Sequence, residues 1–274
     1  MPSYVDSLKA HLADYKHNQL GVFEDGLWSR NSQPYPHILP LELRQLNIVA
    51  PIRAAFWEYA EREGLSLQLH RDFHHLNSSQ ALAFNLFFPF VALAWSQPQL
   101  LLAALGLDGK QVASFGFEVV PDPQEGTNFD FLAIFSDDTR LFVEVKLAET
   151  EFGRCEPDAR HEEKRQSLYV GRLADKVIPT CLESPAFFSS YQLLRNLSHL
   201  SPADTLILLV PRANRGTFEQ AHTFIADAVM PRWHSRVHLV ALEELIEAVS
   251  APTRNAETIA LTESLREKYL AHGV

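Results

Sequence analysis

The sequence predicts an α/β protein, because helical and strand patterns alternate along the chain. Its central part reads as a helix, three strands, a helix and a further strand, an order that suits a mixed central sheet flanked by helices. Hydrophobic residues make up 46% of the 274 residues, enough to bury a substantial core. We expect this α-β-β-β-α-β core to carry an N-terminal helical extension and a C-terminal α/β addition.

The helices are predicted by apolar residues at helical spacing and by capping residues. A first helix ends near Tyr15, and another spans about Leu41–Glu63 and stops at Gly64. The next begins at the N-cap sequence Asn77-Ser78-Ser79, and Pro89 is expected to kink or restart it. The other expected helices are Pro185–Leu200, Phe218–Val229 and a terminal helical region.

The strands are predicted by short apolar or alternating runs. They are Gln111–Val120, two strands within Asn128–Leu147, Thr205–Val210 and Val237–Ala241. Residues 149–176 are polar and mixed in charge, which suggests a lid, an insertion or a solvated helix. We therefore expect a helical and loop-rich extension at residues 1–75, a core domain at residues 76–250 and a helical tail at residues 251–274.

Composition limits the class of protein. The two cysteines, Cys155 and Cys181, give no disulfide framework and no zinc pattern, and without a secretory signal they fit a cytoplasmic protein. The longest apolar stretch, Ala81–Trp95, is too short to span a bilayer, so we expect no membrane association.

The net charge of −10 weighs against a broad basic surface for nucleic acid, but leaves room for a local basic groove. With no glycine-rich phosphate loop and no GxSxG sequence, nucleotide hydrolysis and serine hydrolysis have no support.

Charged residues interrupt the two apolar strands of Asn128–Leu147, which read NFDFLAIFSDDTRLFVEVKL. Because side chains alternate along a strand, Asp130 lies on one face of the first strand, and Glu144 and Lys146 share one face of the second. An unpaired buried carboxylate is costly, so we expect a cation, an ion pair or a raised pKa to compensate.

The length of the connecting turn decides whether these charged residues share one face of the sheet. A three-residue loop at Ser136–Asp138 would oppose Asp130 to Glu144, and one at Asp137–Thr139 would oppose it to Lys146. A two-residue Asp-Asp turn would separate them. Asp-Asp lacks the glycine that two-residue hairpins favour, and this favours a three-residue loop. Such a loop would bring Asp130 to the sheet face of Glu144 and Lys146.

Two acids and a lysine in this arrangement suit the hydrolysis of a phosphodiester bond. Asp130 and Glu144 could hold one or two magnesium ions, which prefer oxygen ligands, lower the pKa of bound water and neutralise the phosphate. Lys146, on the same side of its strand as Glu144, could orient the water or stabilise the developing charge. The alternative is a structural ion pair within the hairpin.

Asp130, followed by Glu144-Val145-Lys146 on the next strand, resembles the motif of the PD-(D/E)xK nuclease superfamily with its restriction-endonuclease-like fold. The resemblance covers roughly Gln111–Val210, with the helix from Ser79 as the first core helix, so residues 76–250 would be the nuclease-like domain. One departure is Phe129, which stands where the motif often has a proline.

Two further segments carry the resemblance. His75–Phe87 (HLNSSQALAFNLF) and Tyr191–Asn196 (YQLLRN) are similar to bacterial sequences described as restriction endonucleases of this superfamily. The resemblance implies a cytoplasmic, Mg²⁺-dependent DNA endonuclease, with Mn²⁺ able to replace Mg²⁺. Because cutting both strands often needs two active sites, a homodimer is a reasonable expectation. The alternative is an inactive module of the same fold that binds nucleic acid or a protein.

The resemblance also implies roles for individual residues. Asp130 and Glu144 would bind the metal, and Lys146 would be the catalytic lysine. Glu118, at the end of the preceding strand, is either a third metal ligand or a solvated acid. Gln80 and Asn85 on the first core helix either face the substrate or cap and fill that helix.

The expected helix Pro185–Leu200 carries a polar stripe of residues at i, i+3, i+4 and i+7. These residues are Gln192, Arg195, Asn196 and His199. By the resemblance, Gln192 would be an auxiliary catalytic group near the metal, and Arg195 would contact a substrate phosphate; the alternative is a solvated helix face. The basic residues of the preceding polar segment likewise either follow a nucleic-acid backbone or form a solvated face. They are Lys164, Arg165, Arg172 and Lys176.

Overall fold

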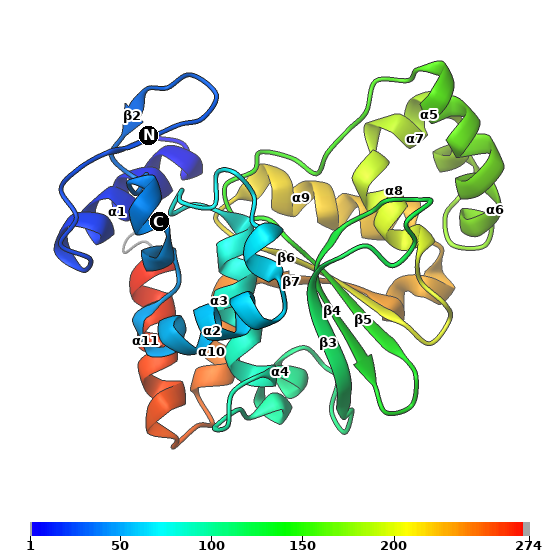
Figure 1. Cartoon of the computed structure of the whole chain (residues 1–274). Coiled ribbons are helices and arrows are strands. Elements are labelled where there is room, and N and C mark those ends of the chain that lie inside the picture. Colours follow the sequence, from blue (N-terminus) through cyan, green and yellow to red (C-terminus); the bar gives the residue numbers. More distant parts are fainter. Residues whose placement is uncertain (1, 271–274) are drawn as a thin grey trace. The chain divides into compact units, whose positions relative to one another are not determined.

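The computed structural model of the chain describes residues 2–270. These residues form two compact units, which we call the sheet unit (Ala113–Val240) and the helical unit (the described residues before and after it). Figure 1 shows the elements of each unit.

The helical unit consists mainly of short helices. Its elements are α1 (Tyr4–Asn18), β1 (Gly26–Leu27), β2 (Pro34–Tyr35), the 3₁₀ segments Leu41–Asn47, Ala50–Ile52 and Leu65–Leu67, α2 (Arg53–Arg62), α3 (Ser79–Val91), α4 (Pro98–Ala104), α10 (Leu242–Ser250) and α11 (Ala256–Tyr269). α10 packs on α4 and α11, and α11 also contacts α1. Segments from both ends of the sequence therefore share this unit, which also contains α3, the helix expected to open the nuclease core.

The single helix predicted over Leu41–Glu63 is wrong, because the segment is two 3₁₀ turns followed by α2. The interruption lies at Ile48 and Val49, which have extended backbone conformations. The amide of Val49 donates to Asn85 Oδ1 (2.9 Å) instead of to a helical carbonyl. Tertiary hydrogen bonding thus outweighs local helix propensity here. The expected stop is confirmed, since Gly64 has a φ of 68°.

α3 begins where its capping residues predict. The hydroxyl of Ser78 accepts a hydrogen bond from the amide of Ala81 (3.3 Å). The helix runs through Pro89 and ends at Val91, so Pro89 lies in the last turn and no second helix restarts there. The backbone hydrogen bond that the proline nitrogen cannot donate is therefore lost only near the end of the helix.

The sheet unit is built on a five-stranded mixed sheet of order β3-β4-β5-β6-β7. The strands are β3 (Val112–Val119), β4 (Phe129–Phe135), β5 (Arg140–Val145), β6 (Thr205–Val210) and β7 (Val237–Ala241). β5 pairs antiparallel with β4 and parallel with β6. A parallel pair needs a crossover, and the helices between β5 and β6 provide it.

The crossover contains short helices that Figure 1 shows grouped beyond the end of the β4–β5 hairpin opposite its turn. They are α5 (Ala159–Lys164), a π-helical turn (Arg165–Tyr169), α6 (Val170–Leu173), a 3₁₀ turn (Pro179–Leu182), α7 (Ser184–Ser189) and α8 (Tyr191–Ser198). After β6 come α9 (Arg215–Thr223), a π-helical turn (Phe224–Ala228) and a 3₁₀ segment (Pro231–Arg236). The polar residues 149–176 are therefore a loop followed by helices.

The single helix predicted over Pro185–Leu200 is also wrong, since α7 and α8 meet at a break. Ser190 has φ −118° and ψ 30°, outside the helical region. Next to the break, the amide of Gln192 donates to the carbonyl of Gly153 (2.9 Å). The start of α8 is thus fixed against the loop that follows β5.

The β4–β5 turn is a three-residue loop that brings Asp130 to the sheet face of Glu144 and Lys146. Phe131 pairs with Val143 and Ile134 with Arg140, and the amide of Phe135 donates to the carbonyl of Thr139 (2.9 Å). The loop is therefore Ser136–Asp138, the first of the two three-residue alternatives. Continuing this register places Asp130 opposite Glu144, on the face that also carries Lys146.

Asp138 occupies the left-handed backbone region of this loop, with a φ of 62°. Replacing it with glycine is expected to raise the free energy of unfolding by about 0.5–1 kcal/mol, because relieved strain outweighs the greater unfolded-state entropy of glycine. Urea unfolding measures the change. Asp137→Gly, at the neighbouring loop position, is the control and should lower stability; equal effects of the two variants would contradict this account.

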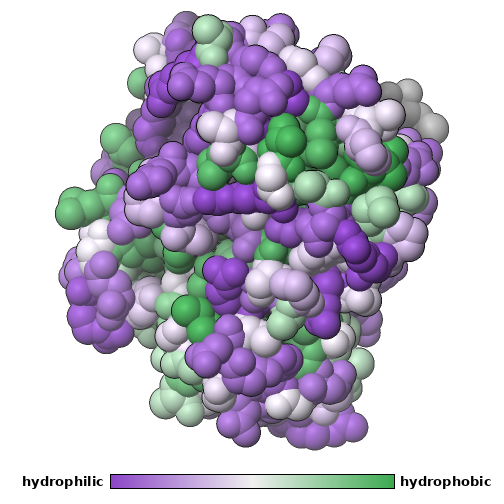
Figure 2. Space-filling view, turned by 90° about the vertical axis from the view of Figure 1, so that its right-hand side faces the viewer, coloured by the Kyte–Doolittle hydropathy of each residue, from purple (hydrophilic) through white to green (hydrophobic). Residues whose placement is uncertain are grey.

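The face drawn in Figure 2 is largely hydrophilic, with hydrophobic residues in smaller groups between. Among the described residues, no helix is both long and apolar enough to cross a membrane.

Candidate active site

The hairpin brings Asp130, Glu144 and Lys146 together on one face of the sheet. Glu144 and Lys146 are buried, with 4% and 9% of their surface exposed. Lys146 Nζ lies 2.9 Å from Glu144 Oε1. Asp130 Oδ2 accepts a hydrogen bond from the amide of Val145 (2.7 Å), so this carboxylate is tied to the strand that carries the other two.

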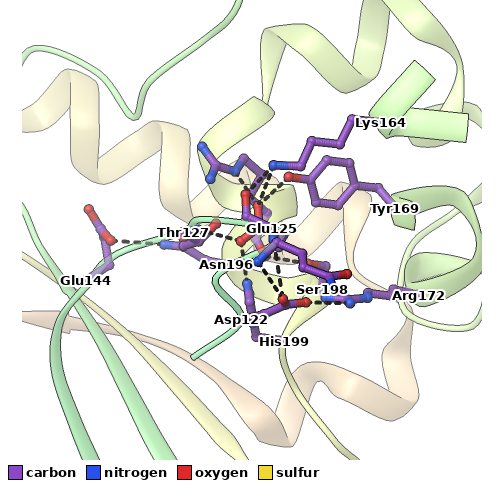
Figure 3. Close-up of polar contacts among 12 residues, drawn as sticks. Asp122, Glu125, Thr127, Glu144, Lys164, Tyr169, Arg172, Asn196, Ser198 and His199 are labelled. Atoms are coloured by element: carbon purple, nitrogen blue, oxygen red, sulfur yellow. Dashed lines mark hydrogen bonds and ion pairs between the residues drawn. The ribbon is translucent and has the colours of Figure 1, made fainter. Parts of the chain in front are cut away.

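Helix α8 supplies two amide side chains to Glu144. Gln192 Nε2 donates to Glu144 Oε1 (2.6 Å), and Asn196 Nδ2 donates to Glu144 Oε2 (3.2 Å), the latter drawn in Figure 3. Gln192 Oε1 in turn accepts from the amide of Gly153 (2.9 Å). Gln192 and Asn196 lie one helical turn apart on α8, and each donates to a different oxygen of Glu144. The two hydrogen bonds together fix the orientation of the carboxylate.

The charges of these groups perturb one another. Burial raises the pKa of Asp130 well above its ordinary value, and the nearby carboxylates of Glu144 and Glu118 raise it further. Burial lowers the pKa of Lys146, but the carboxylates of Glu144 and Glu149 outweigh this effect and raise its pKa above the usual value. Lys146 is therefore an ammonium, and this face carries one cation for two acids, so the anionic form of Asp130 is disfavoured.

Two acids that share one cation, together with their oxygen atoms, fit a divalent metal ion. The carboxylates of Asp130 and Glu144 are hard oxygen donors whose mutual repulsion a cation would relieve. The described part of the chain has no group of three or more His, Cys, Asp and Glu side chains placed to hold a metal. The donor set is therefore the two carboxylates, which suits Mg²⁺ because this ion keeps several water ligands.

The other expected site residues lie as follows. Glu118, at a φ of 52° in β3, accepts a hydrogen bond from Asn128 Nδ2 (2.5 Å) and is close enough to raise the pKa of Asp130. Gln80 and Asn85 belong to the helical unit, where their side chains bond within that unit. Gln80 accepts from the amide of His70, and Asn85 donates to the hydroxyl of Tyr269. These bonds match the filling role of the two residues.

A second buried carboxylate, which the sequence reading missed, lies next to this site. Glu125 belongs to the loop between β3 and β4, and its side chain is fully buried. Figure 3 shows the donors that surround it. They are Tyr169 Oη, Arg195 Nε (2.8 Å), His199 Nε2 (2.8 Å) and the amide of Thr127 (2.6 Å). Arg195 and His199, two members of the predicted polar stripe, therefore hold Glu125, while the other two hold Glu144.

The basic residues of the crossover are mostly engaged within the protein. Arg165 and Lys176 are buried, so the solvated-face alternative is wrong for them. Arg165 pairs with Glu162, Arg172 pairs with Asp122, Lys176 Nζ donates to the carbonyl of Ser198 and Lys164 Nζ to that of Glu125. Lys176 thus joins the crossover to α8, and Arg172 and Lys164 join it to the loop before β4.

A mixed sheet whose hairpin carries two acids and a lysine on one face is compatible with a nuclease-like fold. The chain belongs to the REase-ARP family, described as restriction endonuclease associating with ARP, whose model matches residues 9–270. Comparisons with curated proteins and with solved structures give no significant match. A restriction endonuclease-like family membership covering most of the chain is thus established.

Proposed function

We propose that the chain is a metal-dependent DNA endonuclease of the PD-(D/E)xK type. The observation that carries this proposal is the register of the β4–β5 hairpin, which places Asp130 opposite Glu144 with Lys146 on the same face. A purely structural ion pair would need one acid and the lysine, whereas this face carries a second acid, Asp130, whose pKa is raised by burial and by the nearby Glu144. The family description supports DNA as the substrate.

Each residue has a separate role in this proposal. Asp130 and Glu144 hold Mg²⁺, which when bound supplies charge neutralisation of the phosphate and a water of lowered pKa. Lys146, as an ammonium, donates hydrogen bonds to the negative charge that develops on the scissile phosphate. Gln192 and Asn196 keep the Glu144 carboxylate in a fixed orientation. Glu118 stays a candidate for a further acid at this centre.

Removal of the metal tests this function. Purified protein with Mg²⁺ or Mn²⁺ is expected to cleave plasmid DNA, and a chelator should lower the rate by roughly a thousandfold, because the ion provides several kcal/mol of charge stabilisation. Agarose gels measure nicked and linear products. Cleavage that persists in chelator would refute the metal role. No cleavage by folded protein with either metal would favour the inactive-module alternative.

A further inference from the structure

A pocket of about 450 Å³ adjoins the candidate active site. Three segments of the sheet unit line it: residues 126–128 before β4, residues 153–155 after β5, and the first turns of α8. Two of its lining residues, Gln192 and Asn196, also bond Glu144. The pocket and the carboxylate site therefore share these two side chains.

Two buried oxygen atoms of the pocket residues lack a hydrogen-bond partner among the described residues. They are Thr127 Oγ1 and Asn196 Oδ1, from residues with 5% and 0% of their surface exposed. Their surroundings fix both residues, because the Thr127 amide donates to Glu125 and the Asn196 amide group to Glu144. A buried polar atom without a partner is unfavourable, and an amide oxygen can only accept. The Asn196 oxygen therefore calls for a ligand that donates a hydrogen bond, and the Thr127 hydroxyl can accept or donate one.

The charged residues that line the pocket are both arginines. They are Arg154 and Arg195, and no carboxylate is among the lining residues, although the chain has a net charge of −10. Arg195 is held in place by Glu125 and lies over the ring of Tyr191, 5.1 Å from its centroid. A guanidinium fixed in this way binds phosphate and offers a flat surface on which a base can stack.

We propose that this pocket receives one unstacked nucleotide of the DNA strand next to the cleaved bond. Its phosphate would face the arginines, and donor groups of its base would bond Thr127 Oγ1 and Asn196 Oδ1. A phosphodiester group alone does not explain the pocket, because it has no hydrogen-bond donor for the amide oxygen of Asn196. The volume is that of a small-molecule site, so a paired duplex does not fit and the nucleotide must leave its stack. The inference rests on the proposed function for its substrate class.

The variant Thr127→Val tests the pocket, because it removes an unpartnered hydroxyl at nearly constant volume. Binding of 2-aminopurine deoxyriboside monophosphate, followed by its fluorescence, is expected to weaken about fivefold, the loss of one neutral hydrogen bond. Thermal unfolding should show equal or higher stability. Thr205→Val is the matched control, since Thr205 is equally buried (5% exposed) at the start of β6 and lies outside the pocket lining, and it should leave binding unchanged.

Alkylation of cysteines locates the bound nucleotide. Cys155 lines the pocket, and the partly exposed Cys181 does not, so the nucleotide should protect Cys155 alone from N-ethylmaleimide. Equal protection by inorganic phosphate, no nucleotide binding, or binding that Thr127→Val leaves unchanged would each overturn the proposal. These measurements involve no cleavage. Nucleotide binding with no nuclease activity would therefore refute the proposed function and keep the pocket, whereas cleavage without nucleotide binding would do the reverse.

Discussion

Replacing Glu144 with glutamine is expected to lower the rate of DNA cleavage by roughly a thousandfold or more, because the variant loses one of two metal-binding charges. Glutamine has nearly the same shape, but its amide group would meet donors already aimed at both oxygens, from Lys146, Gln192 and Asn196. We therefore expect weaker metal binding together with a lower maximal rate. Cleavage assays over a range of Mg²⁺ concentrations measure both quantities.

The matched control for this variant is Glu219→Gln. Glu219 is exposed on α9 in the same unit, so its replacement removes the same charge from the chain without touching the site. Cleavage by Glu219→Gln should equal that of the wild type, and circular dichroism should show that both variants are folded. Wild-type activity in a folded Glu144→Gln protein would refute the role of Glu144.

Replacing Glu125 with glutamine is expected to lower the free energy of unfolding of the protein by about 3 kcal/mol, because removing one partner of a buried ionic network leaves the others unpaired. The carboxylate accepts hydrogen bonds from Tyr169, Arg195 and His199, and glutamine offers one acceptor oxygen in its place. Urea unfolding at neutral pH measures the loss. The exposed Glu163 provides the control Glu163→Gln, whose effect should stay within about 0.5 kcal/mol.

The same variant should change how the free energy of unfolding depends on pH below neutrality. Burial raises the pKa of Glu125, but hydrogen bonds from His199, the Thr127 amide, Tyr169 and Arg195 outweigh burial and hold it well below its ordinary value. A carboxyl whose pKa is depressed in the folded state stabilises that state, and this contribution is complete above the unfolded-state pKa of about 4.3. The contribution is lost progressively as the pH falls below that value. The difference between wild type and Glu125→Gln should therefore shrink from pH 7 to pH 3, and a constant difference would contradict this assignment.

The parts of the fold that local pattern determines could be predicted from the sequence. β6 and β7 begin and end at the predicted residues, because both are short apolar runs with clear boundaries. The absence of glycine in the Asp-Asp turn favoured a three-residue loop, and the structure has the first of the two alternatives, Ser136–Asp138, with Asp130 on the face of Glu144. The helix breaks at Ile48 and Ser190 could not be predicted, because they depend on segments that are distant in sequence. Next to each break, a backbone amide donates a hydrogen bond to such a segment, Val49 to Asn85 and Gln192 to Gly153.

The candidate site could be predicted only in part for a similar reason. The stripe on α8 follows from helical spacing, but spacing does not tell which acids its members bind. Glu125 belongs to the sequence Pro121-Asp122-Pro123-Gln124-Glu125-Gly126, which has the composition of an exposed turn. Its burial comes from Tyr169, Arg195 and His199, which the crossover brings from 44 to 74 residues away. The four-residue polar stripe, too long for one carboxylate, was the available signal for a second acid.

The parallel pairing of β5 with β6 has a consequence for the order in which the site assembles. The β4–β5 hairpin closes over a three-residue loop, whereas β6 meets β5 only after the crossover has formed, as in the pair of Leu141 with Thr205. Local contacts form faster than contacts between distant residues, because closing a long loop costs more chain entropy. We therefore expect Asp130 and Glu144 to come together early during folding, and Gln192 and Asn196 to reach them late. A nascent chain would then carry two adjacent acids with no fixed orientation, and cutting activity would appear only when the whole sheet is complete.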